Sequence, residues 1–226
     1  PTVQFIDNIY GFKNRLSFNK IKVFPKRLIV INENCEKYAS DEGIPKNIIE
    51  VCGHPAWEKI NKDYMRNNKN TLFIGSPIKR FYKNSLGYSE MEIWNICLKI
   101  KKTLPKLISK LNYLEHPNQE TPDYINKKYI LKNTNNINLN TYGQVIGAFS
   151  SLLTESYLKG KNVISIQAKN ILDDKWIISK CYKSNYAKNY KETCDLFKRK
   201  NIIDYSIVKD INNSSYRIKN LIDKII

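Results

Sequence analysis

The sequence predicts an α/β protein whose parallel sheets are divided between two domains. Short apolar runs rich in β-branched residues alternate with segments of helical periodicity, which is the pattern of strands joined by helical crossovers. The chain has 226 residues and is 42% hydrophobic, enough for the cores of two small domains. A polar stretch over residues 61–70 separates two such patterns. We therefore place the first domain at residues 1–66 and the second at residues 71–226.

The first domain contains three expected strands. They are residues 3–6, 27–31 and 48–52. Asn32 is typical of a helix N-cap, and the helix that follows over residues 35–42 should end at Gly43, because Pro45 blocks its continuation. Pro55 stands where the first turn of a further helix is expected.

The second domain starts a new α/β pattern with four expected strands. They are residues 71–74, 111–115, 144–149 and 162–166. A long helix after Ser89 has an apolar face that includes Trp94 and Cys97 at helical spacing. A shorter helix is expected over residues 152–159, and an amphipathic helix near residues 218–225 ends the chain.

Charge and cysteine content exclude several classes of protein. The net charge of +17 is spread over every segment without a nucleic-acid-binding motif, so we expect attraction to anionic nucleotides or an inner membrane surface but no specific nucleic acid. The five scattered cysteines form no Cys-x-x-Cys pair, which argues against a zinc ribbon or a disulfide framework. Free thiols, with no apolar run long enough for a bilayer and no visible signal peptide, predict a cytoplasmic protein, at most peripheral at the inner membrane face.

The segment Ser150-Ser151-Leu152-Leu153-Thr154-Glu155 is the most informative for function. Its two serines stand at a strand-to-helix junction, where unpaired N–H groups and the helix dipole favour a phosphate. Either serine alone would also serve as a helix cap. Glu155, one turn into the helix, is placed to accept a hydrogen bond from a sugar or ribose hydroxyl, or to face solvent.

Two further turns follow expected strands of the second domain. Gly75-Ser76 follows the first of them, and His116-Pro117 follows the second. The proline restricts the chain behind His116, whose ring can donate to a phosphate oxygen. Because ligands bind at the carboxyl ends of parallel strands, we expect these turns and Ser150-Ser151 to meet at one site.

These motifs together resemble the carboxyl half of bacterial GT-B glycosyltransferases. The resemblance rests on residues 114–117, 150–155 and 160–165, and it covers about residues 71–168. A His-Pro pair followed by Ser-Ser is similar to the pair of the CMP-sugar-dependent sialyltransferases, polysialyltransferases and capsule Kdo transferases, and the CDP-glycerol transferases are similar too. Residues 27–55 more loosely resemble late amino-domain strands of GT-B enzymes and sugar-nucleotide 2-epimerases.

The resemblance implies two Rossmann-like domains and a glycosyl transfer from a nucleotide-activated sugar, with a CMP-sugar favoured, to a cell-envelope glycan or glycolipid. His116, Ser150 and Ser151 would hold the donor's nucleotide and phosphate. Neither a metal nor a cofactor is expected, and no Asp-x-Asp motif is present. Asp7, at the end of the first strand, is the candidate for the catalytic base.

The sequence departs from that family in two ways. Asp41-Glu42-Gly43 has the letters of the polysialyltransferase acidic motif but stands at a helix end, so we interpret it as a cap. The amino-terminal half is short for a full Rossmann-like domain, and we expect its early strands to be missing. Two alternatives stay open. One is a sugar-nucleotide 2-epimerase or hydrolase of the same fold, which would typically have Gly-Gly after the serine at the helix end, where this chain has Ser150-Ser151-Leu152-Leu153. The other is a non-catalytic nucleotide-binding module of envelope biosynthesis.

Overall fold

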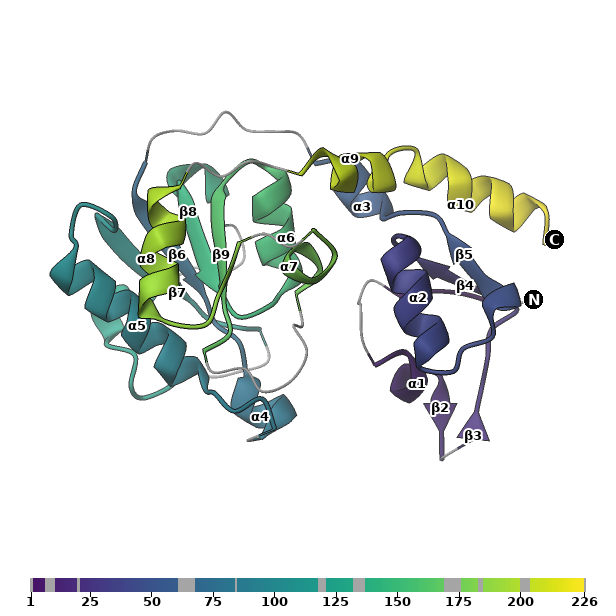
Figure 1. Ribbon diagram of the computed structural model, residues 1–226, viewed down its shortest axis with the longest axis horizontal. Coiled ribbons are helices and arrows are strands. Elements are labelled where there is room, and N and C mark those ends of the chain that lie inside the picture. The colour runs from purple at the N-terminus through teal and green to yellow at the C-terminus, as the bar shows by residue number, and fades with distance from the viewer. Residues whose placement is uncertain are drawn as a thin grey trace. The chain divides into compact units, whose positions relative to one another are not determined.

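The computed structural model confirms an α/β protein with parallel sheets (Figure 1). It describes residues 2–6, 11–19, 21–60, 68–83, 85–117, 121–131, 137–168, 176–182, 185–199 and 204–225. The chain divides into two compact units. The first unit comprises Pro1–Ile60 and Asp204–Ile226, and the second comprises Asn61–Ile203.

The first unit is built on a parallel sheet with the strand order β1-β4-β5. Its strands are β1 (Val3–Phe5), β4 (Arg27–Val30) and β5 (Ile49–Val51), and a small antiparallel hairpin consists of β2 (Ser17–Phe18) and β3 (Ile21–Lys22). Its helices are α1 (Phe12–Arg15), α2 (Glu33–Asp41), the 3₁₀ turn η1 (Lys46–Ile48), α3 (Pro55–Glu58), α9 (Tyr205–Ile211) and α10 (Ser214–Asp223).

Helix α2 has the N-cap and the terminal glycine that its sequence predicts, although it begins at Glu33, two residues before the expected range of 35–42. The side chain of Asn32 accepts a hydrogen bond from the Cys35 N–H at 2.9 Å, which satisfies one of the unpaired donors of the first turn. At the other end Glu42 is the C-cap, and Gly43 adopts a positive φ of 88°. The Glu42 carboxylate also accepts from the N–H groups of Gly11 and Lys13 at 2.9 and 3.0 Å, so this acid anchors α1.

The last two helices belong to the first unit, whereas the sequence placed residues 204–226 in the second domain. The N–H and hydroxyl of Ser215 both donate to the Glu58 carboxylate, at 3.0 and 2.8 Å. Gly53, with φ at 85°, leaves the space in which Ser214 and Arg217 approach the end of β5. An amphipathic helix alone does not specify which sheet it covers, and the complementary surface here is contributed by residues more than 150 positions earlier in the chain.

The second unit contains a five-stranded parallel sheet with the order β10-β9-β8-β6-β7. Its strands are β6 (Asn70–Ile74), β7 (Lys110–Leu114), β8 (Gln144–Gly147), β9 (Asn162–Ile166) and β10 (Tyr186–Ala187). Its helices are α4 (Ile78–Tyr82), α5 (Glu90–Thr103), α6 (Ser151–Leu158), α7 (Ile177–Tyr182) and α8 (Tyr190–Lys198), with 3₁₀ turns η2 (Lys127–Tyr129) and η3 (Leu139–Thr141). The chain reverses its direction of winding between β6 and β8, which is the switch point where ligands bind in open α/β sheets.

Helices cover both faces of this sheet (Figure 1). Successive side chains of a strand point to opposite faces. Phe73 therefore packs with Trp94 of α5 and Phe197 of α8 in one core, while Leu72 and Ile74 face the other side. Helices α6 and α7 cover that other side, where the Trp176 indole N–H donates to the Thr154 hydroxyl at 3.1 Å.

The predicted boundary between the domains lies partly outside the described residues. Residues 61–67 are not described, and Asn70 already belongs to β6. Asn68 donates through its amide to the Thr141 carbonyl at 2.7 Å, so the end of the expected linker is bound to the second unit. Among the described residues, no helix has the length and apolarity needed to cross a bilayer.

Candidate functional site

A cleft of about 790 Å³ lies at the carboxyl ends of β6 and β7 and beside the start of α6. It is lined by Ile74, Gly75, Leu114, Glu115, His116, Pro117, Ile137, Leu139, Ser150, Ser151, Leu152, Glu155 and Lys159. Six of the predicted site residues are thus brought together, although their strands and helices are up to 80 positions apart in sequence. A cavity of this size is typical of sites for nucleotide-sized ligands.

Ser150 and Ser151 divide the two roles that the sequence left open. Ser150 is the N-cap of α6, and its hydroxyl accepts a hydrogen bond from the Leu153 N–H at 3.3 Å. Ser151 is exposed at the first helical position and lines the cleft. Among the described residues, no acceptor pairs with the N–H groups of Ser151 and Leu152. The start of α6 therefore offers two backbone donors, one hydroxyl and the positive end of the helix dipole to an anion.

His116 stands half-buried in the turn after β7. Burial lowers the pKa of its imidazole, because a charged ring loses hydration there. The nearby carboxylate of Glu90 acts in the opposite direction, and Arg80 adds to the lowering. In its protonated form the ring carries a charge that complements a phosphate.

Glu155 and Lys159 extend the cleft along α6. They are four positions apart, so they share one face of the helix. Burial raises the pKa of the Glu155 carboxyl, while Lys159 opposes that change. Lys159 was not predicted as a site residue, although the i,i+4 relation to Glu155 is a signal that could have identified it. The pair offers the same ligand a carboxylate, which can accept a hydrogen bond from a hydroxyl, and an ammonium cation.

The turn after β6 differs from the prediction. Gly75 lines the cleft, but its N–H donates to the Leu114 carbonyl at 2.8 Å. Ser76 is only 6% exposed and is absent from the lining of the cleft, and its N–H donates to the Glu90 carboxylate at 2.7 Å. We therefore correct the assignment of Ser76 to the phosphate site: its backbone donor is taken up by a protein carboxylate.

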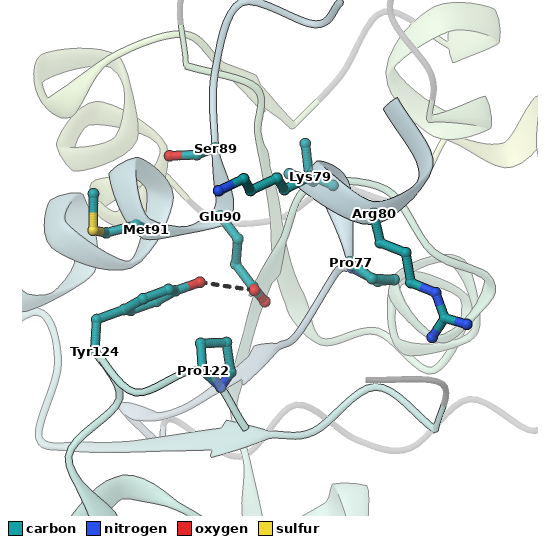
Figure 2. Close-up of a pocket in the computed structure, with 9 residues that line it drawn as sticks. Pro77, Lys79, Arg80, Ser89, Glu90, Met91, Pro122 and Tyr124 are labelled. Carbon is teal, nitrogen blue, oxygen red and sulfur yellow. Dashed lines mark hydrogen bonds between the residues drawn. The ribbon is translucent and has the colours of Figure 1, made fainter. Parts of the chain in front are cut away.

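A second hollow of about 600 Å³ is lined in part by Pro77 and Ile78, which follow this turn (Figure 2). It is lined by Pro77, Ile78, Lys79, Arg80, Ser89, Glu90, Met91, Pro122 and Tyr124. The hydroxyl of Tyr124 donates to Glu90 at 2.9 Å, as the dashed line in Figure 2 shows. Glu90 was not predicted as a site residue, because an acid directly after a helix N-cap is ordinarily a surface residue that complements the helix dipole.

The predicted catalytic base, Asp7, lies outside the described residues. Its role stays a prediction. Within the described ranges, no three side chains of His, Cys, Asp or Glu gather as a metal-binding group.

Comparisons with known proteins locate the fold. No protein-family model matches the chain, and no curated protein matches it either. Among solved structures, the UDP-GlcNAc 2-epimerase of Neisseria meningitidis bound to UDP-GlcNAc superposes with a TM-score of 0.55 and 12% identity, and that of Methanocaldococcus jannaschii with a TM-score of 0.50 and 12% identity. Each match covers 88% of this chain and 62% of the other.

The chain has a GT-B-like fold. The predicted fold class is confirmed, and the chain spans about 62% of the length of these two structures. At 12% identity the likeness shows the fold alone. The predicted resemblance to the sialyltransferase and Kdo transferase group gains no family match, and the structural likeness is to sugar-nucleotide epimerases instead.

Proposed function

We propose that the cleft in the second unit of this GT-B-like chain binds the nucleotide and phosphate of a nucleotide-activated sugar. The observation that carries this proposal is the convergence of His116, Ser151 and Glu155 on one cleft at the start of α6. The unpaired N–H groups of Ser151 and Leu152 suit a phosphate oxygen. The known GT-B-like neighbour was solved with UDP-GlcNAc, which supports a ligand of this class.

The reaction that we propose is glycosyl transfer to a cell-envelope glycan or glycolipid, with a CMP-sugar as the favoured donor. The chain's own contribution would be to stabilise negative charge as it builds up on the departing phosphate. Protonated His116, the Lys159 ammonium and the α6 N–H groups would provide that stabilisation. A carboxylate of the first unit, with Asp7 as the candidate, would take the acceptor's proton.

A sugar-nucleotide 2-epimerase is the second candidate, and the likeness to two such enzymes favours it. The start of α6 argues against an epimerase. Such an enzyme would typically have glycines there, which let the backbone approach a phosphate closely, whereas this chain has Leu152 and Leu153. Here Leu153 is fully buried instead, and the glycine that makes room for it is Gly147 of β8: a Cβ at that position would lie 3.2 Å from the Leu153 side chain. At this strand-to-helix junction the glycine therefore lies in β8 and not at the start of α6.

Calorimetric titration with CMP, UMP, UDP and AMP tests both candidates. We expect CMP to bind more tightly than the other three nucleotides, and the His116→Ala variant to bind CMP more weakly than the parent does. A preference for UDP would favour the epimerase. Absence of binding by all four nucleotides to the folded parent would refute the proposed function.

A further inference from the structure

Glu90 is a buried carboxylate, 5% exposed, at the first position of α5. One of its oxygens accepts hydrogen bonds from the Ser76 N–H at 2.7 Å and the Tyr113 hydroxyl at 3.0 Å. The other accepts from the Tyr124 hydroxyl at 2.9 Å (Figure 2). The Glu90 side chain therefore links α5 to the turn after β6 and to Tyr113, near the carboxyl end of β7. These are two of the strand ends that form the nucleotide cleft.

The backbone around Glu90 is shaped to permit these bonds. A Cβ atom at Gly75 would lie 2.6 Å from the Tyr113 hydroxyl and 2.8 Å from the Leu114 carbonyl. Glycine at this position therefore lets Tyr113 pass beneath the turn and reach Glu90. The Tyr113 ring is held by Phe73, stacked at 5.6 Å between centroids, and by the edge of Trp94 at 5.7 Å. The hydroxyl is thus aimed by packing on both sides.

The three donors orient the charge of Glu90 without neutralising it. Burial, followed by the charge of Glu90, raises the pKa values of Tyr113 and Tyr124. Both phenols therefore stay protonated at physiological pH and act as donors. A backbone N–H and two neutral hydroxyls hold the carboxylate in place.

The negative charge of Glu90 acts on the imidazole of His116. The carboxylate of Glu90 raises the pKa of His116, against the lowering by burial and by Arg80. The other charged groups that line the cleft are Glu115, Glu155 and Lys159. His116 lies two positions after Leu114, whose carbonyl accepts from Gly75, so the same strand ends that Glu90 links also support the histidine.

We propose that Glu90 is a positioning residue: its hydrogen bonds to the Ser76 N–H and the Tyr113 hydroxyl fix the turn after β6 and the end of β7 beside His116, and its buried carboxylate places a negative charge near the imidazole that faces a bound phosphate. The role in phosphate binding rests on the proposed function of the cleft. The electrostatic link between Glu90 and His116 does not, and it is measurable without a ligand.

The test is an NMR titration of the histidine ring protons in the parent and in Glu90→Gln. The chain has two histidines, so the spectrum is simple, and His54 of the first unit is an internal reference. The His116 pKa should fall in Glu90→Gln, because the neighbouring negative charge is removed, while the His54 pKa stays constant. Nucleotide affinity at pH 6 should fall together with the His116 pKa, by up to about tenfold for each unit by which that pKa falls.

The matched control is Glu92→Gln. Glu92 lies on the same turn of α5 and its removal changes the net charge equally, but its carboxylate accepts from the Ser89 N–H at 2.8 Å in the capping box. This variant should leave the His116 pKa where it is. An equal shift in both variants would show a general charge effect and overturn the specific role of Glu90.

Glu90→Asp covers the case in which Glu90→Gln does not fold. It keeps the charge but draws it back toward α5 by one methylene, so His116 should titrate below the parent and above the Gln variant. An unchanged His116 pKa in whichever variant folds overturns the proposal. If the parent binds no nucleotide, the proposed function fails while the titration still decides the role of Glu90.

Discussion

The chain contains two His-Pro turns, each directly after a parallel strand, and they differ in almost everything else. In the first unit, the His54 ring accepts from the Trp57 N–H at 3.3 Å, stacks on Trp57 at 4.0 Å between centroids and contacts Phe5 edge-on. In the second unit, His116 lines an open cleft beside the start of α6. One turn completes a helix and its packing, whereas the other lines a cleft in which we propose that its ring meets a ligand.

The surroundings of each histidine explain the difference. Gly53, before the first turn, adopts a positive φ and lets α10 pack against the end of β5. Apolar and helical elements therefore cover that strand end. After β7 the chain continues through Pro117 along the cleft, and the neighbouring helix α6 points its unpaired N–H groups there. The same dipeptide is packed into the first unit or lines a cleft, according to what packs over the strand end.

The largest effect is expected at the covered turn, from Gly53→Ala. The added Cβ would meet the Ser214 hydroxyl, and it would approach the Arg217 guanidinium and the Asp210 carbonyl to 2.7 Å each, in a backbone conformation that side chains avoid. We expect a loss of about 3 kcal/mol or more in the free energy of unfolding, measured with urea. Gly11→Ala is the control: its φ is 73° but nothing lies within 4 Å, so it should cost only about 1–2 kcal/mol. Equal losses would show that the packing of α10 contributes nothing.

Replacing each histidine with alanine compares the two turns directly. His116→Ala should weaken nucleotide binding by about 1.5–3 kcal/mol, as for a hydrogen bond to a charged group, with little change in stability. His54→Ala should lower the free energy of unfolding by about 1–2 kcal/mol, through the lost cap and ring stacking, and leave affinity unchanged. Calorimetry and urea unfolding on both variants give the four values. Equal affinities for parent and His116→Ala would remove His116 from the site.

The pH dependence should distinguish the ligand-facing turn further. The folded-state pKa of His116 lies below its ordinary value of about 6.5, so its contribution to stability is present above that value and is lost as the pH falls through the folded-state pKa. Phosphate binding should change in the opposite direction over the same window, because the imidazolium attracts the anion. Titrating His116→Gln in parallel subtracts the ligand's own ionisation. Affinity that is independent of pH in the parent, after that subtraction, would contradict a charged role for the ring.

Local sequence patterns predicted individual strands and helix caps. Packing between residues far apart in the sequence determined other features, such as the burial of Glu90. The strand at residues 162–166 and the caps at Asn32 and Gly43 follow from periodicity and side-chain chemistry. The two-residue strand β10 is too short to have a periodic signal. Strand-end geometry brought His116 and Ser151 to one cleft, as predicted. Glu90 could not be found in this way, because its burial depends on Tyr113, Tyr124 and the Ser76 N–H meeting it from other parts of the fold.

The smallest expected effects separate the two serines at the start of α6. Ser150→Ala removes the side-chain cap of Leu153 and should cost about 1 kcal/mol of stability, measured by urea unfolding, with a secondary effect on affinity. Ser151→Ala leaves the cap and the N–H groups in place, so stability should be unchanged.

For Ser151→Ala, nucleotide affinity should fall by only about 0.5–1.5 kcal/mol, the net value of one hydrogen bond. The remaining donors at the helix start explain why the loss is smaller than that for His116→Ala. A loss as large as that of His116→Ala would mean that the hydroxyl, and not the helix N-terminus, is the main phosphate contact. The division between a capping serine and a ligand-facing serine would then have to be redrawn around Ser151.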